Sequence, residues 1–250
     1  MIKIANNLID PNTLTSKYMP NSVESKIVGI MASSRRVYYY DSQNQLDFEL
    51  KLRKSTINAS RDLNKSNMSF RIFTKSKCNP DFWNRTNEGG FELKEGVKPS
   101  DAIKDIYIHS SKYGTECATA MVILYYKALV DVLQEGLFNR LFPNIYLMNW
   151  MHLDRDLGLS HVYTEDYLPG DGRYFKNPDV NPATPEWQGE NVILLENGLY
   201  YGHGLGIAPG EKIIAELNKK RISGSTKSAY LMEQVKRLDF KGLSNKYYSY

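Results

Sequence analysis

Residues 115–132 read TECATAMVILYYKALVDV, and this stretch decides the fold. Its apolar residues recur at intervals of three and four, which predicts a helix with one apolar stripe buried in the core. The stripe consists of Cys117, Met121, Leu124, Tyr125, Ala128 and Val132. Gly114 breaks the chain before this helix and Thr115 can cap it, so Cys117 is predicted to lie in the first turn.

The composition of the chain is that of a globular protein with one large core. Its 250 residues are 42% apolar, so we expect a single domain over residues 1–250. The net charge is only +4 and the basic residues are scattered, so no nucleic-acid partner is expected. The chain lacks both an export signal and an apolar run of about 18 residues. We therefore expect no membrane partner, and synthesis in the cytoplasm without a signal peptide.

The rest of the chain predicts a mixture of helices and short strands, and therefore an α+β fold. Residues 1–40 are expected to form an irregular N-terminal wrap, because prolines and polar residues interrupt the short apolar runs. Residues 169–185 are rich in Pro, Gly, Asp and Asn, which predicts a long surface loop. Helices are expected at residues 46–63, 99–108, 210–221 and 228–238, and short strands or extended segments at 70–73, 82–83, 91–93 and 145–148.

A β-hairpin is predicted where Asn197-Gly198 separates two apolar runs, at residues 192–195 and 199–203. A two-residue turn at Asn197-Gly198 pairs Val192 with His203, which puts Glu190 and His203 on one face. The apolar residues of that face predict that it points to the core; they are Val192, Leu194, Tyr201 and Leu205. If the Cys117 helix packs on this face, a thiol, a carboxyl and an imidazole converge.

A cysteine in the first turn of a helix lies among unpaired backbone N–H groups at the positive end of the helix dipole. This environment favours the thiolate, and the same N–H groups can hydrogen-bond an oxyanion. The segment Thr115–Ala118 therefore suits acyl transfer by Cys117. Cys78 and Cys117 are expected to be free thiols, since chains that depend on disulfides usually carry more cysteines.

Each candidate residue also has a plainer interpretation. Cys117 can be a small core residue, Glu190 a solvated acid at a strand end, and His203 a hydrogen-bonded core histidine. Glu116 can simply complement the helix dipole, or it can serve as an alternative base. The other histidines and the aspartates do not have the spacing of metal ligands, so neither a metal nor a cofactor is expected.

Three blocks together resemble the spore-coat transglutaminases of endospore-forming bacteria: Glu116-Cys117-Ala118-Thr119-Ala120, Trp187-Gln188-Gly189-Glu190-Asn191 and His203-Gly204-Leu205-Gly206. The similarity extends to residues 48–53, 174–178 and 228–231, and so covers nearly the whole chain. The resemblance implies a fold related to papain-like and peptidoglycan-peptidase thiol enzymes, with the cysteine helix packed on a small antiparallel sheet. It also implies that Cys117 works with Glu190, which Glu116 can replace, while His203 is kept at the site.

The activity implied by this resemblance is protein-glutamine γ-glutamyl transfer. Cys117 would form a thioester with a protein glutamine, and a protein lysine would then attack it, which cross-links spore-coat proteins. Trp187 lies close enough to Glu190 in sequence to line a site that excludes water, and the family likeness adds Trp150 and Phe70. We expect a monomer that resides in the spore coat. Two alternatives are a cysteine amidohydrolase or peptidase that uses Cys117 with His203, and a non-enzymatic coat protein.

Overall fold

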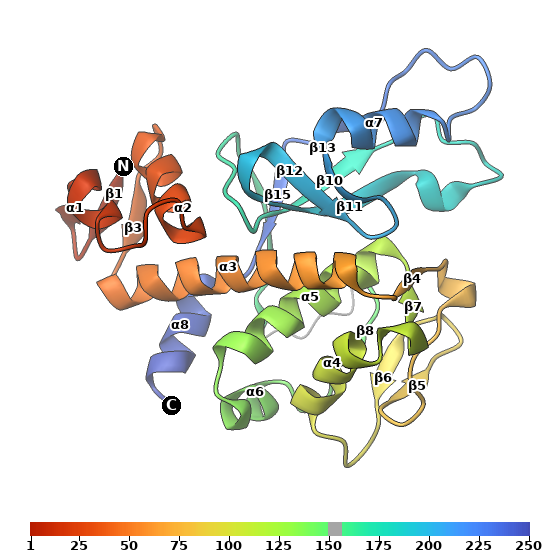
Figure 1. Cartoon of the computed structure of the whole chain (residues 1–250), viewed down its shortest axis with the longest axis horizontal. Helices are drawn as coiled ribbons and strands as arrows, with labels where there is room; N and C mark the ends of the chain where they lie inside the picture. The colour runs from red at the N-terminus through yellow and green to blue at the C-terminus, as the bar shows by residue number, and fades with distance from the viewer. Residues whose placement is uncertain (150–156) are drawn as a thin grey trace.

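The long helix α3 (Gln43–Lys65) crosses the middle of the molecule and separates its two layers (Figure 1). The computed structural model describes residues 1–149 and 157–250. The Ser42 side chain caps α3 by accepting from the Gln45 N–H, and Ser66 ends the helix. The predicted helix at residues 46–63 is therefore confirmed.

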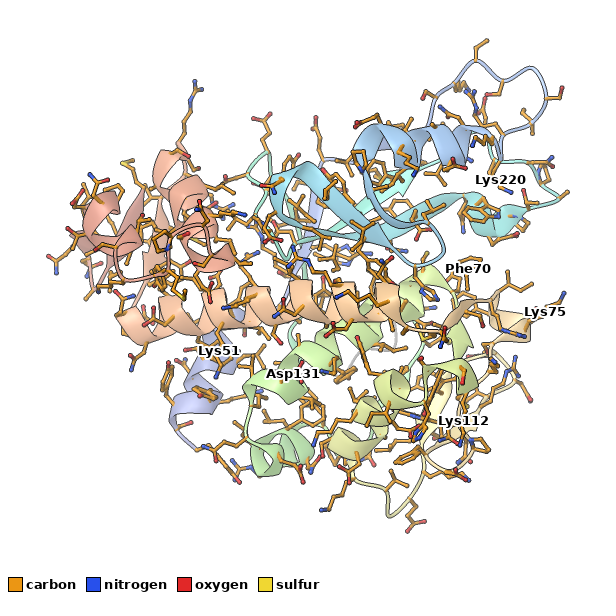
Figure 2. All side chains as sticks on the ribbon, viewed as in Figure 1. Lys51, Phe70, Lys75, Lys112, Asp131 and Lys220 are labelled. Atoms are coloured by element: carbon orange, nitrogen blue, oxygen red, sulfur yellow. The ribbon has the colours of Figure 1, made fainter. Side chains whose placement is uncertain are left out.

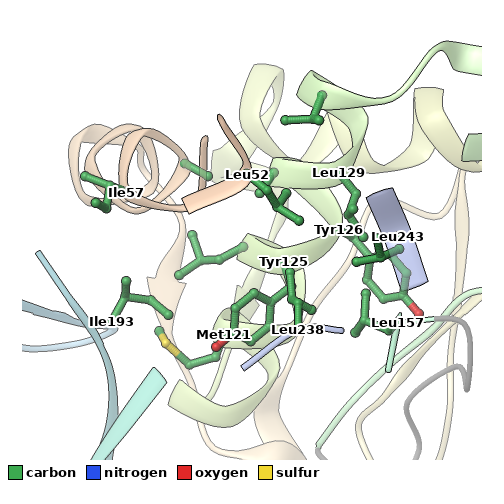
Figure 3. Close-up of a cluster of buried hydrophobic side chains, with 14 of the residues drawn as sticks. Leu52, Ile57, Met121, Tyr125, Tyr126, Leu129, Leu157, Ile193, Leu238 and Leu243 are labelled. Carbon is green, nitrogen blue, oxygen red and sulfur yellow. The ribbon is translucent and has the colours of Figure 1, made fainter. Parts of the chain in front are cut away.

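Helix α5 (Cys117–Val132) packs against α3 and forms the centre of the core. Leu52 and Ile57 of α3 face Met121 and Tyr125 of α5, as Figure 3 shows. The predicted helix is confirmed, although burial is not restricted to the predicted stripe: residues 117–126 are all buried. The cap differs from the prediction, because Glu116 rather than Thr115 is the N-cap residue.

An antiparallel sheet forms the upper layer in Figure 1. Its strand order is β13-β12-β11-β10-β15-β9, and β14 also pairs with β10. The strands are β9 (Ser160–Tyr163), β10 (Gly172–Lys176), β11 (Gly189–Leu194), β12 (Leu199–Gly202), β13 (Gly206–Pro209), β14 (Tyr230–Leu231) and β15 (Gln234–Arg237). Ile193 and Tyr201 face the α3–α5 core, whereas Val192 packs with Ile213 of α7 (Gly210–Asn218). The sheet therefore lies between the main core and α7.

The register of the β11–β12 hairpin differs by one residue from the prediction. Val192 pairs with Gly202 rather than His203, because the turn contains three residues, Glu196–Gly198, and not two. Asn197 and Gly198 both adopt positive φ angles, 59° and 72°, which this turn requires. A shift of one residue moves every side chain to the other face. The prediction that Glu190 and His203 share a face is therefore wrong.

Several other segments differ from the predictions. The expected loop at 169–185 contains strand β10, and the expected helix at 228–238 forms strands β14 and β15. In both segments, pairing within the sheet overrides local propensity. Residues 1–40 are not irregular, because they form β1 (Ile2–Ile4), β2 (Asn7–Leu8), β3 (Tyr38–Tyr40), α1 (Pro11–Thr15) and α2 (Val23–Ser33).

A buried ion-pair network fixes the sheet to α3. Arg53 of α3 contacts Asp171, which directly precedes β10, at 2.9 Å, and Arg237 of β15 contacts the same carboxylate at 2.7 Å. Arg53 and Asp171 are 1% and 0% exposed. The opposite charges of Arg53 and Arg237 keep the pKa of Asp171 below its usual value although burial opposes this. This network sets the position of β10, and with it β11, above α5.

The remaining elements lie mainly in the lower layer (Figure 1). The helices are α4 (Pro99–Ile108), as predicted, α6 (Glu135–Leu141) and the unpredicted α8 (Phe240–Tyr248). Two small sheets complete the fold, one of β4 (Ser69–Phe70) with β7 (Gly114–Thr115), and one of β5 (Trp83–Arg85), β6 (Phe91–Leu93) and β8 (Tyr146–Leu147). Among the described residues, no helix combines the length and apolar character that crossing a membrane requires.

Candidate active site

Cys117 is the first residue of α5, and two features hold it there. Strand β7, immediately before it, pairs in parallel with β4 at Ser69 and Phe70. The Glu116 carboxylate caps the helix by accepting from the Ala118 N–H at 3.3 Å. The other Glu116 oxygen, Oε1, lies 3.9 Å from Cys117 Sγ. The predicted position of the thiol at a helix start is confirmed, with a carboxyl group beside it.

Strand β11 covers the thiol from the sheet side. Asn191 Nδ2 donates to Cys117 Sγ at 3.4 Å, and Asn191 Oδ1 accepts from Lys236 Nζ of β15 at 3.0 Å. The sequence analysis singled out neither residue. Asn191 was quoted only as the last residue of the block Trp187–Asn191, and no role at the thiol was predicted for it.

Glu190 is buried, and its charge acts on the thiol although it is not among the residues that line the thiol cavity. It is 1% exposed, and its Oε1 atom has no hydrogen-bond partner among residues 1–149 and 157–250. Its side chain lies against Gly202, where an added Cβ would come within 2.9 Å of Glu190 Cγ. Burial, reinforced by the negative charge of Glu116, raises the pKa of Glu190 well above its usual value. Glu190 is therefore suited to hold a proton near neutral pH.

The thiol and both carboxyl groups affect one another through their charges. Burial raises the pKa of Cys117 well above its usual value, and the charges of Glu190 and Glu116 raise it further. Burial also raises the pKa of Glu116. Three acids in one desolvated site resist carrying more than one negative charge between them. When one proton leaves, the resulting negative charge is therefore distributed over Cys117, Glu116 and Glu190.

The thiol opens on a cavity of about 320 Å³ between α5 and the sheet. The lining includes Glu116, Cys117, Tyr174, Glu186, Asn191 and Lys236. A neighbouring groove of about 290 Å³ continues from Glu116 and Glu186 over Ile72, Phe73 and Pro185. The groove combines apolar walls with two carboxylates, which suits the stem and the ammonium group of a lysine side chain.

His203 lies outside this cavity. It lines a different cavity, of about 220 Å³, together with Phe70 and Tyr201. Its Nδ1 atom is 3.2 Å from the Tyr201 hydroxyl and its Nε2 atom is 3.3 Å from the Ser69 carbonyl oxygen. The carbonyl can only accept, so Nε2 carries the proton and Nδ1 accepts from Tyr201. Burial lowers the pKa of His203 to about 4, and the ring is therefore neutral at pH 7.

Of the three predicted aromatic residues, two form a stack. The rings of Phe70 and Trp187 lie 5.6 Å apart at an interplanar angle of 27°, and Phe70 also contacts His203, with ring centroids 6.1 Å apart. Lys220 Nζ lies 5.1 Å from the centre of the Trp187 ring. Phe70 is at the edge of the molecule where the two layers meet, with Lys220 beside it on the sheet layer (Figure 2). Trp150 lies outside the described residues.

Both cysteines are free thiols, as predicted. Cys78 is half-buried, and burial raises its pKa to about 11. Within the part of the chain that the structure describes, no three His, Cys, Asp or Glu side chains are grouped so that they could hold a metal ion.

Comparison with known proteins identifies the family. The family model described as protein-glutamine gamma-glutamyltransferase matches residues 1–247. The chain belongs to this family. It is therefore an acyltransferase whose substrates are proteins that bear glutamine and lysine.

Two curated relatives carry the same name. The protein-glutamine gamma-glutamyltransferase of Bacillus mycoides (strain KBAB4) is 46% identical over 245 residues, which are 98% of this chain and 88% of the relative. That of Bacillus anthracis (strain CDC 684 / NRRL 3495) is 44% identical over the same shares. A solved structure, the transglutaminase from Geobacillus stearothermophilus without its C-terminal extension, is 50% identical with a TM-score of 0.79, and the match covers 82% of this chain and 98% of that one.

Proposed function

We propose that Cys117 is the nucleophile of this transglutaminase and that the reaction passes through a thioester. One observation carries the proposal: a free thiol at a helix start opens on a cavity, with the Glu116 carboxyl group 3.9 Å away and the buried Glu190 close enough to affect its pKa. The other cysteine, Cys78, is outside the residues that line this cavity. The arrangement also supports a relationship to papain-like thiol enzymes, since the cysteine helix packs on an antiparallel sheet.

The proposed reaction has two halves. In the first, Cys117 Sγ attacks the carbonyl carbon of the glutamine side chain, and the thiol proton passes to one of the two carboxylates. The Asn191 Nδ2 group, 3.4 Å from Sγ, is close enough to donate to the oxyanion that forms. The Ala118 N–H already donates to Glu116, so the helix start has one fewer free donor than the sequence suggests. Ammonia then leaves with a proton from Glu190, and the thioester remains.

In the second half, a neutral lysine amine attacks the thioester carbonyl. The C–N bond forms, the C–S bond breaks, and a carboxylate accepts the amine proton and passes it to Cys117 Sγ, which is released as a thiol. The groove over Ile72, Phe73 and Pro185 gives the lysine stem an apolar path to the thiol cavity. Glu186 and Glu116 at its polar wall attract the ammonium form before it loses its proton.

Glu190 is the proposed principal acid and base, and Glu116 is its alternative. Burial favours the protonated form of Glu190, and Glu116 Oε1 lies 3.9 Å from Sγ. His203 is proposed to remain neutral and to hold Tyr201 and the β4 backbone in place.

The aromatic residues are proposed to keep water away from the thioester. The Phe70–Trp187 stack lies beside His203. Its two apolar rings would limit the access of water to the thioester. The proposed contribution of Trp150 rests on the family resemblance.

Proteins of the spore coat are the proposed substrates, and the coat is the proposed location. The support is the family membership and the Bacillus origin of the curated relatives. We also propose that the enzyme is a monomer. Three of its most exposed large apolar side chains lie in different parts of the fold: Met19 in the loop between α1 and α2, Ile108 at the end of α4, and Tyr163 at the end of β9. The mass of the protein in solution tests this last proposal.

The experiment that tests the function measures incorporation of a labelled primary amine into a glutamine-bearing protein, together with release of ammonia. Wild type and Cys78→Ala should incorporate the amine equally, and Cys117→Ala should show no incorporation above background at matched folding. An amidohydrolase would release ammonia without incorporation, and a non-enzymatic protein would do neither. Amine incorporation by Cys117→Ala would reject the proposed nucleophile.

A further inference from the structure

Lys236 places a buried cation beside the thiol. This residue belongs to β15, is 6% exposed and lines the same cavity as Cys117 and Glu116. A lysine is rarely buried to this extent unless its ammonium group has a specific partner. The mechanism described above makes no use of this residue.

The contact between Lys236 and Asn191 fixes the orientation of the asparagine amide. Lys236 Nζ lies 3.0 Å from Asn191 Oδ1, and an ammonium group can only donate. The oxygen end of the amide must therefore face Lys236, which leaves the N–H end facing Cys117 Sγ at 3.4 Å. With the amide reversed, its oxygen would face the sulfur and would repel a thiolate.

The charged surroundings show why such a cation matters. Among residues 1–149 and 157–250, the titratable groups that share the cavity with Lys236 are Glu116, Cys117, His161, Tyr174 and Glu186. Of these groups, only His161 can carry a positive charge. Burial and the charge of Lys236, its cross-strand partner, lower the pKa of His161. Within the described part of the chain, Lys236 is thus the cation in this cavity that can offset the negative charge that builds up at the thiol.

We propose that Lys236 is a positioning residue for this thiol: its ammonium group holds the Asn191 amide with an N–H directed at Cys117 Sγ, and thereby favours the thiolate. The inference rests on the proposed role of Cys117. The same N–H remains in place as negative charge passes from sulfur to the carbonyl oxygen of the substrate. Burial lowers the pKa of Lys236 to about 7, while the negative charge of Cys117 favours the ammonium form. Formation of the thiolate and retention of the ammonium group therefore support each other.

The test is the rate at which iodoacetamide alkylates Cys117 as a function of pH, followed by mass spectrometry of the peptide that carries it. This measures the thiolate directly and requires no transglutaminase turnover. Lys236→Met keeps the length and the apolar stem but removes the charge, and Lys236→Arg keeps a cation. Lys51→Met is the matched control, since Lys51 is exposed on α3 far from Phe70 (Figure 2).

We expect Lys236→Met to move the alkylation profile upward by about one pH unit, so that the rate at pH 7 falls about tenfold. Lys236→Arg and Lys51→Met should stay close to the wild-type profile. A Lys236→Met profile that coincides with that of the wild type, in a protein with unchanged thermal unfolding, would overturn the proposal. Failure here would leave amine incorporation dependent on Cys117, so it is distinguishable from failure of the proposed function.

A double-variant comparison tests whether the effect passes through Asn191. If it does, Asn191→Ala raises the profile by itself, and adding Lys236→Met in that background produces little further shift. If Lys236→Met shifts the alkylation profile as much in the Asn191→Ala background as in wild type, the proposal that Lys236 acts through Asn191 is overturned. If Lys236→Met does not fold, Asn191→Ala alone remains decisive, because an unchanged profile in that variant also contradicts the proposal.

Discussion

The surroundings of Cys117 and of His203 differ in how burial changes the pKa of their titratable groups. On the Cys117 side, burial raises the pKa of Glu116 and Glu190, so that both carboxyl groups can hold protons. On the His203 side, burial lowers the imidazole pKa to about 4, and both ring nitrogens are occupied by hydrogen bonds. The difference supports the proposal that carboxyl groups move protons in this enzyme and that the histidine supports the structure.

The largest effect that would test this comparison is expected from Glu190→Gln. The amide matches the size of the carboxyl group but cannot exchange a proton with the thiol or with ammonia. Amine incorporation, measured as kcat/KM, should fall about 100-fold or more. Activity within a few-fold of wild type would show that Glu190 does not carry the transferred proton.

A smaller effect is expected from Glu116→Gln. Glutamine retains an oxygen that can accept from the Ala118 N–H, so the helix cap and the thermal stability should be preserved. Loss of one ionisable group next to Sγ should lower kcat/KM about tenfold. A loss as large as that of Glu190→Gln would reverse the proposed order of the two acids.

The aromatic wall is tested by Trp187→Ala, which removes the ring that stacks on Phe70. Water should then compete better with the amine, and the ratio of deamidated to cross-linked glutamine should rise several-fold. Mass spectrometry of one glutamine peptide with and without added amine measures this ratio. An unchanged ratio would show that Trp187 does not exclude water from the thioester.

The smallest effect on activity is expected from His203→Gln, but this variant should alter the dependence of stability on pH. In the native state His203 has a pKa of about 4, below the unfolded value of about 6.5. The unfolded state therefore binds a proton first as the pH falls, and wild type loses stability between about pH 6.5 and pH 4. This contribution amounts to about 3 kcal/mol. Urea unfolding at pH 7 and pH 4 should show that His203→Gln loses less free energy of unfolding than wild type as the pH falls. Equal losses in the two proteins would contradict the lowered pKa of His203.

Local sequence patterns predicted the fold where a single element determines the outcome. The apolar repeat from Cys117 to Val132 and the run at 46–63 predicted α5 and α3, and Gly114 predicted the start of the cysteine helix. Strands β14 and β15 were missed because Leu231 and Met232 have helical propensity, and only pairing with distant strands makes these segments extended.

The candidate site was also predicted only in part, because some of its features depend on how distant strands pair. The motif residues Cys117, Glu116 and Glu190 come together, but the hairpin register depended on one additional turn residue, and that residue moved His203 to a separate cavity. Lys236 lies far from the other site residues in sequence and follows no motif that the sequence analysis used. Its role becomes visible only when β15 is placed beside β10 in the folded sheet.

We propose that the proton shared by Cys117 and Glu190, and not the titration of His203, controls the reaction. The most direct measurement is the pH dependence of kcat/KM for wild type, Glu190→Gln and His203→Gln. The ascending limb should lie well above the usual range of a carboxyl pKa in wild type, shift in Glu190→Gln, and remain unchanged in His203→Gln. An ascending limb that shifts in His203→Gln and stays in place in Glu190→Gln would show that His203, and not Glu190, controls the reaction.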